Sequence, residues 1–349
     1  MNIQKELFGE IDSKEVYEYT LTNSSEFSIS VITYGGIITK IMAPDRDGNL
    51  ENVTVNVNSL EEIVAARPFH GAIIGRVGGR ISNAGYMDGD TKVDLTVVEK
   101  GNTLHGGKNG LDTKLWDATI EKTTDFVTLV LETKLQDGED GFPGEMDIVV
   151  KYTLHEDNKI EINYEGKTTK RTIFNPTNHL YINLTGDQKN TIDSHSLQIN
   201  ADYYGPTKED DTPTGELVHV ENTGYDLRQG NKLENVFQSE DENVQAKGGL
   251  DNPFVLNKEK DIPAVTLIES ESGRSLELFT EAKAVVVYTH NHEQVPETEN
   301  AESIKVHSGL ALEAQQLPDA VNHEAFGSIW LDPEETFTSK STFKFNVID

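Results

Sequence analysis

Apolar and polar residues alternate with a period of two along much of this chain. Residues 27–31, 160–164 and 275–279 follow this pattern, and continuous β-rich runs cover residues 127–131, 147–154, 284–289 and 336–347. Such alternation is typical of antiparallel strands in a sheet with one covered face. Turn signals separate the strands, and no helical crossovers lie between them. The sequence therefore predicts an all-β sandwich and argues against a doubly wound α/β sheet.

Signals for helices are few. Ser59-Leu60-Glu61-Glu62 matches a capping box before the apolar run 63–66, which predicts one short helix there. Segments 137–144, 208–215 and 238–249 are acidic or glycine-rich, and we expect surface loops in them because the strand pattern resumes after each. The length of 349 residues allows one large β domain or two ordinary ones, and no internal repeat divides the chain.

The charge balance limits the partners that the chain could bind. Its 60 acidic and 30 basic residues give a formal net charge of -30. Nucleic acids and anionic lipids are bound mainly through Lys and Arg, so we expect neither nucleic acid nor a membrane as a partner. The N-terminus lacks the apolar segment of a signal peptide, and no apolar run approaches the roughly 20 residues of a transmembrane helix. We therefore expect a soluble, cytoplasmic protein.

Several common cofactor and metal motifs are missing. There is no cysteine, which excludes disulfides, thiolate catalysis, Fe–S clusters and cysteine-based zinc sites. Phosphate-binding loops, dinucleotide-binding turns, HExxH and GxSxG are also absent. Residues 45–48 resemble the start of a calcium loop without its later ligands, so a hairpin turn is favoured. His290 and His292 have the spacing of a metal pair, but no third ligand is suggested nearby, and we expect an exposed turn.

Two histidines are candidates for acid–base chemistry. His179 lies midway along residues 174–184, which alternate like a buried strand after the turn signal Asn175-Pro176. A single histidine in such a run is more often a hydrogen-bonded core residue than a general acid or base. His105 is followed by two glycines, which let the backbone turn sharply and leave the ring open to a ligand. An ordinary loop histidine explains His105 equally well.

Two acids and two arginines are also candidates. Glu313 lies in the apolar run 310–315, where loss of solvation would raise the pKa of its carboxyl toward that of a useful base. Asp251 lies in a turn that begins with two glycines. Arg76 and Arg80 are flanked by apolar residues. One of them is expected to be structural and to bridge to a carboxylate, while the other could direct its guanidinium at substrate oxygens.

Taken in order, these motifs resemble the galactose mutarotase (aldose 1-epimerase) family. The resemblance starts at Tyr34-Gly35-Gly36 and runs almost to the C-terminus, with blocks at residues 75–81, 102–107, 175–179, 251–254, 288–289 and 312–320. Each block alone is a weak signal, and six in the family's order are a strong one. The resemblance implies a large single-domain antiparallel β-sandwich over residues 1–349, of the galactose mutarotase-like supersandwich type, with a sugar site on its concave face.

The resemblance also implies an activity, the interconversion of the α and β anomers of free aldohexoses such as galactose and glucose. Glu313 matches the catalytic base, which takes the proton of the anomeric hydroxyl. His179 matches the catalytic acid, which protonates the ring oxygen. His105 matches a second active-site histidine near the reacting oxygens. The family needs no cofactor and no metal for this reaction, and it includes monomers and homodimers.

Four further residues belong to the substrate site by resemblance. Arg80 and Asp251 match residues that hold sugar hydroxyls, and Gly79 and Asn178 lie in the same blocks of the substrate site. The family commonly has Asn where this chain has Gly79. An amide that could bond a sugar hydroxyl is thus lost, which affects the sugar preference more than the chemistry.

Two alternative functions remain open. An epimerase of hexose 6-phosphates shares the fold but needs a cationic phosphate pocket, which the sparse arginines and the net charge of -30 disfavour. A non-catalytic sugar-binding module on the same fold would be expected to lack the acid or the base, and this chain has both.

Overall fold

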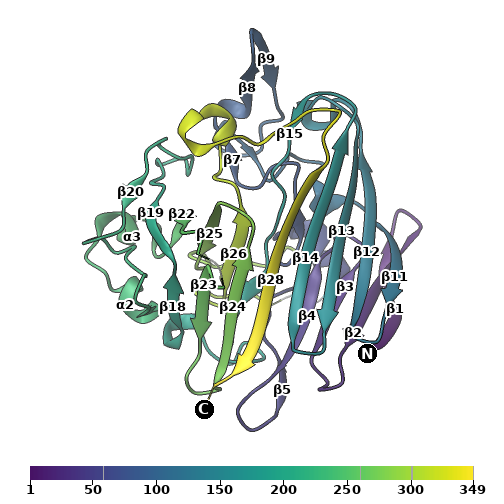
Figure 1. Cartoon of the computed structure of the whole chain (residues 1–349), viewed down its shortest axis with the longest axis vertical. Coiled ribbons are helices and arrows are strands. Elements are labelled where there is room, and N and C mark those ends of the chain that lie inside the picture. Colours follow the sequence, from purple (N-terminus) through teal and green to yellow (C-terminus); the bar gives the residue numbers. More distant parts are fainter. Residues whose placement is uncertain (58, 260, 300–301, 349) are drawn as a thin grey trace.

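Strands dominate the computed structural model, which describes residues 1–57, 59–259, 261–299 and 302–348. Three large sheets make up its body, and every strand pair within them is antiparallel (Figure 1). The all-β sandwich predicted from the alternating pattern is confirmed.

The largest sheet has nine strands, and the C-terminal strand β28 lies in its middle, between β14 and β24 (Figure 1). In spatial order the strands are β11 (Asp117–Lys122), β12 (Phe126–Leu135), β13 (Met146–His155), β14 (Lys159–Thr168), β28 (Phe337–Val347), β24 (Arg274–Thr280), β23 (Val265–Ile268), β18 (Ser196–Ile199) and β21 (Asn231–Lys232).

Two smaller sheets lie behind this one. The five-stranded sheet contains β1 (Asn2–Ile11), β2 (Lys14–Thr22), β3 (Ser28–Ile32), β4 (Ile38–Pro44) and β5 (Leu50–Asn52). The six-stranded sheet contains, in spatial order, β17 (Tyr181–Ile182), β26 (Leu310–Gln315), β25 (Ala284–Tyr288), β22 (Asp251–Leu256), β19 (Ala201–Tyr204) and β20 (Val218–His219). Residues 45–48 form the hairpin turn between β4 and β5, as predicted.

The remaining elements are short. Four two-stranded pairs are β6 (Ile73–Ile74) with β16 (Thr177–Asn178), β7 (Arg80–Ile81) with β10 (Thr103–Leu104), β8 (Gly85–Asp88) with β9 (Thr91–Asp94), and β15 (Thr172–Ile173) with β27 (Trp330–Leu331). The α-helices of the described residues are α1 (Leu60–Ala66), α2 (Leu233–Phe237) and α3 (Glu242–Lys247). Single 3-10 turns cover Ser82–Ala84, Leu111–Thr113, Glu139–Gly141, Ile192–Ser194, Ala320–Asn322 and Glu324–Phe326. Within the described ranges, none of the helices is long and apolar enough to cross a membrane.

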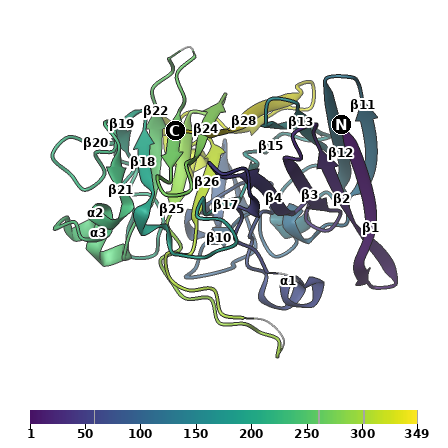
Figure 2. The same ribbon diagram turned by 90° about the horizontal axis from the view of Figure 1, so that it is seen from below.

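One large hydrophobic cluster joins the sheets. The five-stranded sheet lies against the β11–β14 half of the large sheet and the six-stranded sheet against its other half (Figure 2). On β25, Val285 and Val287 belong to this cluster, and on β26 Leu310 and Leu312 do. Alternate residues of a strand point to opposite faces. The six-stranded sheet therefore has one face in the core, and its other face can carry a site.

The predicted short helix is present as α1. The side chain of Ser59 caps it by accepting a hydrogen bond from the backbone N–H of Glu62 at 3.2 Å. Glu62 does not complete a capping box. Its carboxylate accepts from the backbone N–H groups of Glu297 and Thr298, at 2.9 and 2.8 Å, and so ties α1 to the segment after β25 (Figure 2).

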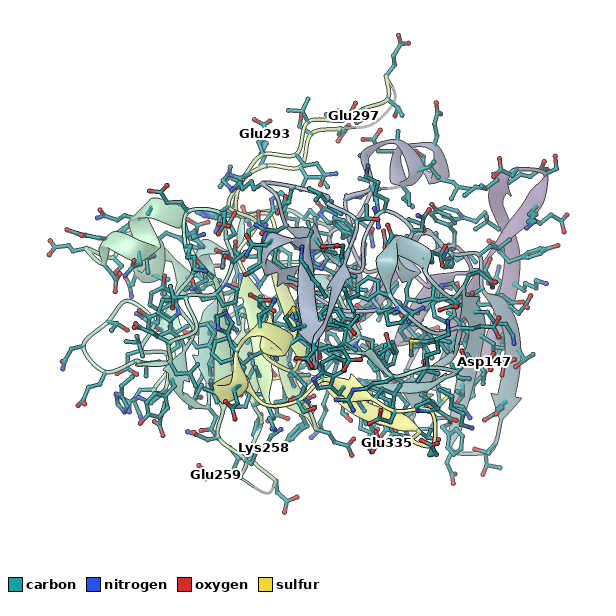
Figure 3. The ribbon with its side chains drawn as sticks, turned by 90° about the horizontal axis from the view of Figure 1, so that it is seen from above. Asp147, Lys258, Glu259, Glu293, Glu297 and Glu335 are labelled. Atoms are coloured by element: carbon teal, nitrogen blue, oxygen red, sulfur yellow. The ribbon has the colours of Figure 1, made fainter. Side chains whose placement is uncertain are left out.

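The expectation of a loop over residues 238–249 was wrong in part, because α3 occupies Glu242–Lys247. Asp241 caps this helix by accepting from the backbone N–H of Asn243 at 3.0 Å, and Gly248 ends it in a left-handed conformation. Both are ordinary helix-boundary signals, and one buried residue, Val244, holds the helix to the core. Charged side chains such as Asp147, Glu259 and Glu335 point away from the body of the protein (Figure 3).

Candidate active site

A cavity of about 320 Å³ lies against the face of the six-stranded sheet that is turned away from the core. Two rows of cross-strand neighbours form its floor. One row is Pro253, Val286 and Glu313, and the next is Asp251, Tyr288, Ala311 and Tyr181. Residues two apart on a strand share a face, so both rows point to the same side. All of these residues except Ala311 line the cavity.

Glu313 is the buried acid of this floor. Its neighbours Leu312 and Ala314 point into the core, and the alternation of β26 turns the carboxyl to the cavity. The side chain is 3% exposed, and its Oε2 atom has no hydrogen-bond partner within the described part of the chain. Burial, with a smaller contribution from the charge of Asp251, raises the pKa of Glu313 to about 8. The predicted effect of the apolar run on this carboxyl is therefore present.

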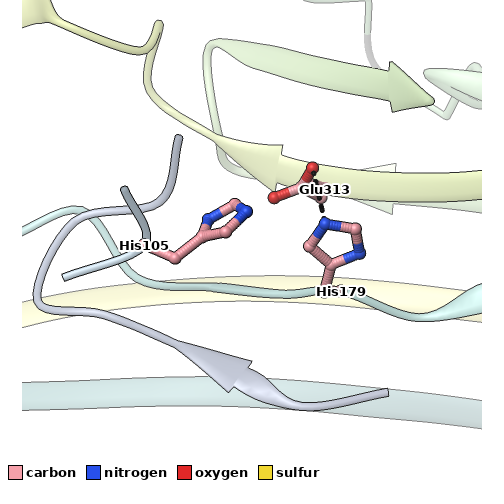
Figure 4. A group of neighbouring side chains, drawn as sticks. All are labelled: His105, His179 and Glu313. Atoms are coloured by element: carbon pink, nitrogen blue, oxygen red, sulfur yellow. Dashed lines mark ion pairs between the residues drawn. The ribbon is translucent and has the colours of Figure 1, made fainter. Parts of the chain in front are cut away.

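His179 faces Glu313 from the segment between β16 and β17. Its Nε2 atom lies 3.5 Å from Oε1 of Glu313 (Figure 4). The backbone of His179 is held by hydrogen bonds to Ala72 and Gly71, and the ring is stacked on Tyr181 at a centroid distance of 5.0 Å. Burial lowers the pKa of His179 to about 4. The ring of His179 therefore faces both a buried carboxyl and the cavity.

The two pKa shifts define how many protons the pair holds. Around neutral pH the carboxyl of Glu313 keeps its proton and the ring of His179 stays neutral, because burial disfavours both charged forms. A carboxylate facing an imidazolium would hold the same single proton. The ionic and neutral forms thus differ only in which residue carries that proton, and the two facing atoms lie 3.5 Å apart.

His105 forms the third side of the pocket, and one hydrogen bond sets its tautomer. The backbone N–H of Gly79 donates to Nδ1 of His105 at 3.1 Å. Burial, followed by the charges of His179 and Arg80, lowers the pKa of His105 well below its usual value, so the ring is neutral. A neutral ring whose Nδ1 accepts must carry its hydrogen on Nε2. His105 is therefore a fixed hydrogen-bond donor.

The two glycines after His105 are required by the turn. His105 itself has φ +48°, and Gly106 and Gly107 have φ +84° and +99°. A Cβ atom on Gly106 would lie 1.9 Å from the backbone oxygen of Gly75, so no larger residue fits. The turn brings the ring of His105 edge-on to that of His179, with centroids 5.2 Å apart (Figure 4).

The donor set does not suit a metal ion. His105, His179 and Glu313 place potential ligand atoms within 4.8 Å of one another, as a three-residue metal site would. However, Nδ1 of His105 already accepts the Gly79 N–H, and Nε2 carries the hydrogen of the neutral ring. Neither nitrogen has a free lone pair for a metal ion, and the remaining two residues are too few for a protein site.

Arg80 and Asp251 also line the cavity, as predicted. Arg80 is held by Glu99 at 2.6 Å and approaches Asp211 at 3.7 Å. Burial raises the pKa of Asp251, and the positive charge of Arg80 opposes that rise. A guanidinium and a carboxyl in one pocket can together donate to and accept from vicinal hydroxyl groups.

Arg76 has the structural role expected for one of the two arginines, although not with the expected partner. It is 1% exposed, and its guanidinium donates to the backbone oxygens of Pro143, Gly144 and Gln136 at 2.7, 2.6 and 3.2 Å. The predicted bridge to a carboxylate was wrong. Backbone carbonyls satisfy the buried cation in its place, together with the hydroxyl of Thr172.

Comparison with known proteins gives the family of this chain. The sequence model of the family described as aldose 1-epimerase matches residues 17–344, which is nearly the whole chain. This chain belongs to the aldose 1-epimerase family. It is accordingly an isomerase that acts as an aldose epimerase.

Similar proteins span the full length of this aldose epimerase. Mouse galactose mutarotase is 34% identical over 99% of both chains, and the maltose epimerase of Levilactobacillus brevis is 30% identical over 99% of both. The crystal structure of galactose 1-epimerase from Lactobacillus acidophilus superimposes with a TM-score of 0.89 at 30% identity, and covers 100% of this chain and 99% of the other.

The resemblance implied that Gly79 stands where the family commonly has Asn. It lines the cavity and has φ +73°, a conformation that favours glycine and that Asn also adopts. A Cβ atom here would lie 2.9 Å from Cβ of Pro318. Gly79 therefore packs closely against Pro318, and it has no side-chain amide to offer to the cavity.

Asn178 is the one predicted site residue that the structure does not bring to the cavity. It is absent from the cavity lining, and its Nδ2 atom donates to the backbone oxygen of Gly71 at 2.9 Å and to the hydroxyl of Tyr152 at 3.1 Å. Because neighbouring residues of an extended segment point to opposite sides, His179 faces the pocket and Asn178 faces the core. Its place in the structure supports a positioning role for Asn178 instead of contact with sugar.

The expected exposed turn at residues 290–292 was also wrong in part. His292 is exposed, but His290 is 3% exposed and packs against the rings of His70 and Tyr181. Its Nδ1 atom pairs with the backbone oxygen of Lys305 at 2.9 Å. This histidine is a core residue, because the strand β25 is followed by a return segment that covers it.

Phe69, Asp211 and Lys247 are among the residues of the pocket wall that sequence reasoning missed. Phe69 has φ +63° and packs on both histidine rings, with centroid distances of 4.8 Å to His105 and 6.3 Å to His179. Asp211 and Lys247 form an ion pair that also lines the cavity. Phe69 follows a helix end and a proline, which signals a turn but not a wall. Asp211 and Lys247 lie in segments that the sequence presents only as acidic surface.

Proposed function

We propose that this protein interconverts the α and β anomers of a free aldohexose, such as galactose or glucose, by opening and closing its pyranose ring. The observation that carries the proposal is the buried pair of Glu313 and His179, whose facing atoms lie 3.5 Å apart at the floor of a cavity. Ring opening removes one proton from the anomeric hydroxyl and adds one to the ring oxygen. A pair that holds one proton between two groups is suited to this exchange.

The reaction would follow four steps. With the pair in its ionic form, the Glu313 carboxylate takes the hydrogen of the C1 hydroxyl. The His179 imidazolium gives its proton to the ring oxygen as the bond between C1 and that oxygen breaks, which leaves an open-chain aldehyde. Rotation about the C1–C2 bond presents the other face of the carbonyl. On closure, His179 takes the proton back and Glu313 returns one to the new anomeric oxygen, so the pair ends as it began.

The remaining residues would hold and polarise the sugar. The Nε2–H group of His105 can donate to an oxygen that gains negative charge as the C1–O bond breaks. Arg80 and Asp251 line the same cavity and offer donors and an acceptor for ring hydroxyls. Each positioned proton transfer contributes a factor of about 10²–10⁴ to the rate.

The charges around the cavity favour a neutral sugar over a sugar phosphate. Its cationic groups are already paired: Arg80 with Glu99 at 2.6 Å, and Lys100 and Lys247 with Asp211. A phosphate would have to displace a carboxylate from one of these pairs. The hexose 6-phosphate alternative is therefore disfavoured by the partners of the arginine and lysines, beyond the net charge alone.

Polarimetry distinguishes the three functions. Freshly dissolved α-galactose or α-glucose should approach its equilibrium rotation faster with the protein than without it, and glucose 6-phosphate should show little acceleration. A preference for the phosphate would establish the first alternative. Binding of sugar without acceleration would establish a non-catalytic sugar-binding module, which the facing acid and base argue against.

Four statements from the sequence remain predictions. They are a single domain over residues 1–349, a monomer or homodimer, a cytoplasmic location, and the lack of nucleic-acid or membrane partners. The hydrophobic cluster shared by all three large sheets supports the single domain.

A further inference from the structure

The segment between α1 and β6 contacts both active-site histidines. In the backbone, the N–H of Gly71 donates to the oxygen of His179, and the N–H of His179 donates to the oxygen of Ala72, each at 2.9 Å. Among the side chains, Phe69 packs on the rings of His105 and His179 with centroid distances of 4.8 and 6.3 Å. The position of both histidines therefore depends on how this segment is held.

Arg67 begins this segment and is fixed by a buried carboxylate. It ends α1 in a left-handed conformation with φ +46°. Its Nε and Nη2 atoms donate to the two carboxylate oxygens of Asp112 at 2.6 and 2.9 Å, and Asp112 is 4% exposed. A forked contact of this kind fixes the plane of a guanidinium as well as its position. The ion pair therefore holds the guanidinium of Arg67 in one orientation.

The guanidinium of Arg67 reaches the turn that carries His105. Its Nη2 atom also donates to the backbone oxygen of Gly107, two residues after His105, at 3.0 Å. The N–H of Gly107 donates to the backbone oxygen of Leu104 at 2.9 Å and closes the turn around His105. His105 has φ +48°, which is an unfavourable conformation for a residue with a side chain and needs support from its surroundings. Arg67 supplies part of that support.

The same guanidinium also supports an aromatic ring beside the histidines. Its Cζ atom lies 5.1 Å from the ring centroid of Phe69, within the range of a cation–π contact. The rings of Phe69 and Tyr181 are each only 22° from parallel with the ring of His179. Closely packed parallel rings leave the imidazole little room to tilt. Arg67 therefore acts on His179 through Phe69, and on His105 through its turn.

The place of this ion pair fits positioning better than sugar binding or stability alone. Neither Arg67 nor Asp112 lines the active-site cavity, so neither is placed to bind sugar directly. A buried ion pair is a weak source of stability, because removing the two charges from water offsets most of their attraction. Proton transfer is sensitive to position, and a shift of about 1 Å can cost a factor of about 10² in rate.

We propose that the forked ion pair of Arg67 and Asp112 is a positioning element that keeps the two active-site histidines oriented for proton transfer. It does so by holding the turn at Gly107 and the ring of Phe69. The inference rests on the proposed function, in which these histidines act on the sugar oxygens. Loss of the pair should therefore slow turnover while the side chains that hold the sugar stay in place.

The test replaces Arg67 by methionine, which keeps most of the length of the side chain and removes the guanidinium. Arg171→Met is the matched control. Arg171 also pairs with a carboxylate, that of Asp332 at 2.9 Å, and also lies over an aromatic ring, that of Trp330 at 4.4 Å. It does not line the active-site cavity. Polarimetry with α-glucose gives kcat and KM for each variant, and urea denaturation gives its stability.

We expect Arg67→Met to lower kcat about tenfold or more. KM should change by less than about a factor of two, because sugar binding stays intact. Arg171→Met should match the wild type in both constants. A kcat of Arg67→Met equal to that of the control overturns the inference, and so does a rise in KM that accounts for the whole fall in kcat/KM.

Two further variants test whether the forked contact acts as a unit. Asp112→Asn should reproduce the fall in kcat, and its combination with Arg67→Met should be no slower than the slower single variant, since residues in one contact are not additive. Arg67→Lys keeps the positive charge and lacks the fork, so it should also lower kcat, and it gives the comparison if Arg67→Met does not fold. A wild-type kcat in Arg67→Lys overturns the inference.

Nitrogen NMR spectra of the histidine rings separate this inference from the proposed function. In the wild type, His105 should show a single tautomer with its hydrogen on Nε2, because the N–H of Gly79 donates to Nδ1. Arg67→Met should add the other tautomer or broaden the signal, and Arg171→Met should do neither. If the wild type does not accelerate the sugar but the ring signal still responds to Arg67→Met, the proposed function fails and the positioning stands. An unchanged ring signal overturns the positioning and leaves the proposed function standing.

Discussion

Nε2 of His179 lies 3.5 Å from Oε1 of Glu313, and both side chains are more than 90% buried. Because the pair holds one proton in either of its forms, it can serve both directions of an anomer exchange without a net gain or loss of charge. A catalyst of an equilibrium must work equally in both directions. Glu313 and His179 meet that requirement, because one takes a proton while the other gives one, and closure of the ring returns both residues to their starting forms.

Replacing Glu313 by Gln should abolish most of the activity. The amide cannot accept the proton of the anomeric hydroxyl, so kcat should fall by a factor of about 10² to 10⁴. Sugar binding should change little, because an amide has almost the same size as the carboxyl. Polarimetry with α-galactose measures kcat, and calorimetry measures binding. The exposed Glu335→Gln is the matched control, and near-wild-type turnover in Glu313→Gln would contradict the assigned role.

The rate should depend on pH as a bell. Below about pH 4, His179 is protonated while Glu313 keeps its own proton, so neither residue can act as a base. Above about pH 8, Glu313 loses the shared proton, and no acid remains. We therefore expect kcat/KM to be highest between these values and to decline on both sides. A profile of kcat/KM for glucose, corrected for the uncatalysed reaction, measures it. A rate that keeps rising above pH 9 would contradict the shared proton.

The burial of Glu313 should also make stability depend on pH. The unfolded carboxyl loses its proton near its ordinary pKa of 4.5, while the folded one keeps it up to about 8. The folded state thus binds more protons between these values, and the free energy of unfolding falls as pH rises. The amide of Glu313→Gln does not titrate, so this fall in the free energy of unfolding is absent from the variant. Its stability relative to the wild type should therefore increase from pH 5 to pH 8, by up to about 1.4 kcal/mol per pH unit. Urea denaturation at several pH values checks this, and parallel curves would refute it.

Much of the fold could be predicted from the sequence, because strand alternation is a local signal. The alternation along β14 correctly predicted a strand, and the apolar run around Glu313 correctly predicted a buried carboxyl. The pairing of distant strands could not be predicted in this way. That β28, at the end of the chain, lies between β14 and β24 depends on contacts that no local pattern encodes. Only the resemblance of six ordered blocks pointed to the overall architecture.

The site residues could be predicted where a residue type is unusual for its surroundings in the sequence. Glu313 and Arg80 stand out because charged residues are unusual in apolar surroundings. Asn178 misled, because its closeness to His179 in sequence does not put it on the same side of the chain. Lys247 was missed, because its role depends on Asp211, which is 36 residues away. Such pairs become visible only when the chain is folded.

Replacing Gly79 by Ala should lower both stability and activity. The side chain would meet Pro318 at 2.9 Å in a left-handed backbone conformation, and any shift would disturb the N–H that donates to His105. Gly48 has a similar φ of +84° with nothing within 4 Å, so Gly48→Ala controls for the backbone conformation alone. Gly79→Ala should be less stable than this control by about 1–3 kcal/mol in urea denaturation, with a lower kcat. Equal stabilities would show that the contact with Pro318 relaxes freely.

Replacement by leucine should mainly lower stability at Arg76 and mainly weaken sugar binding at Arg80. Arg76→Leu leaves the backbone oxygens of Pro143 and Gly144 without their donor, and should cost about 2–4 kcal/mol of unfolding free energy, because buried unsatisfied acceptors are expensive. Arg80→Leu removes a donor from the cavity wall, so KM for glucose should rise about tenfold or more, while stability changes less. Polarimetric kinetics and urea denaturation on both variants give the comparison. If Arg80→Leu destabilised the fold as much as Arg76→Leu and left KM unchanged, Arg80 would be structural, and the sugar would be held by Asp251 and His105 without it.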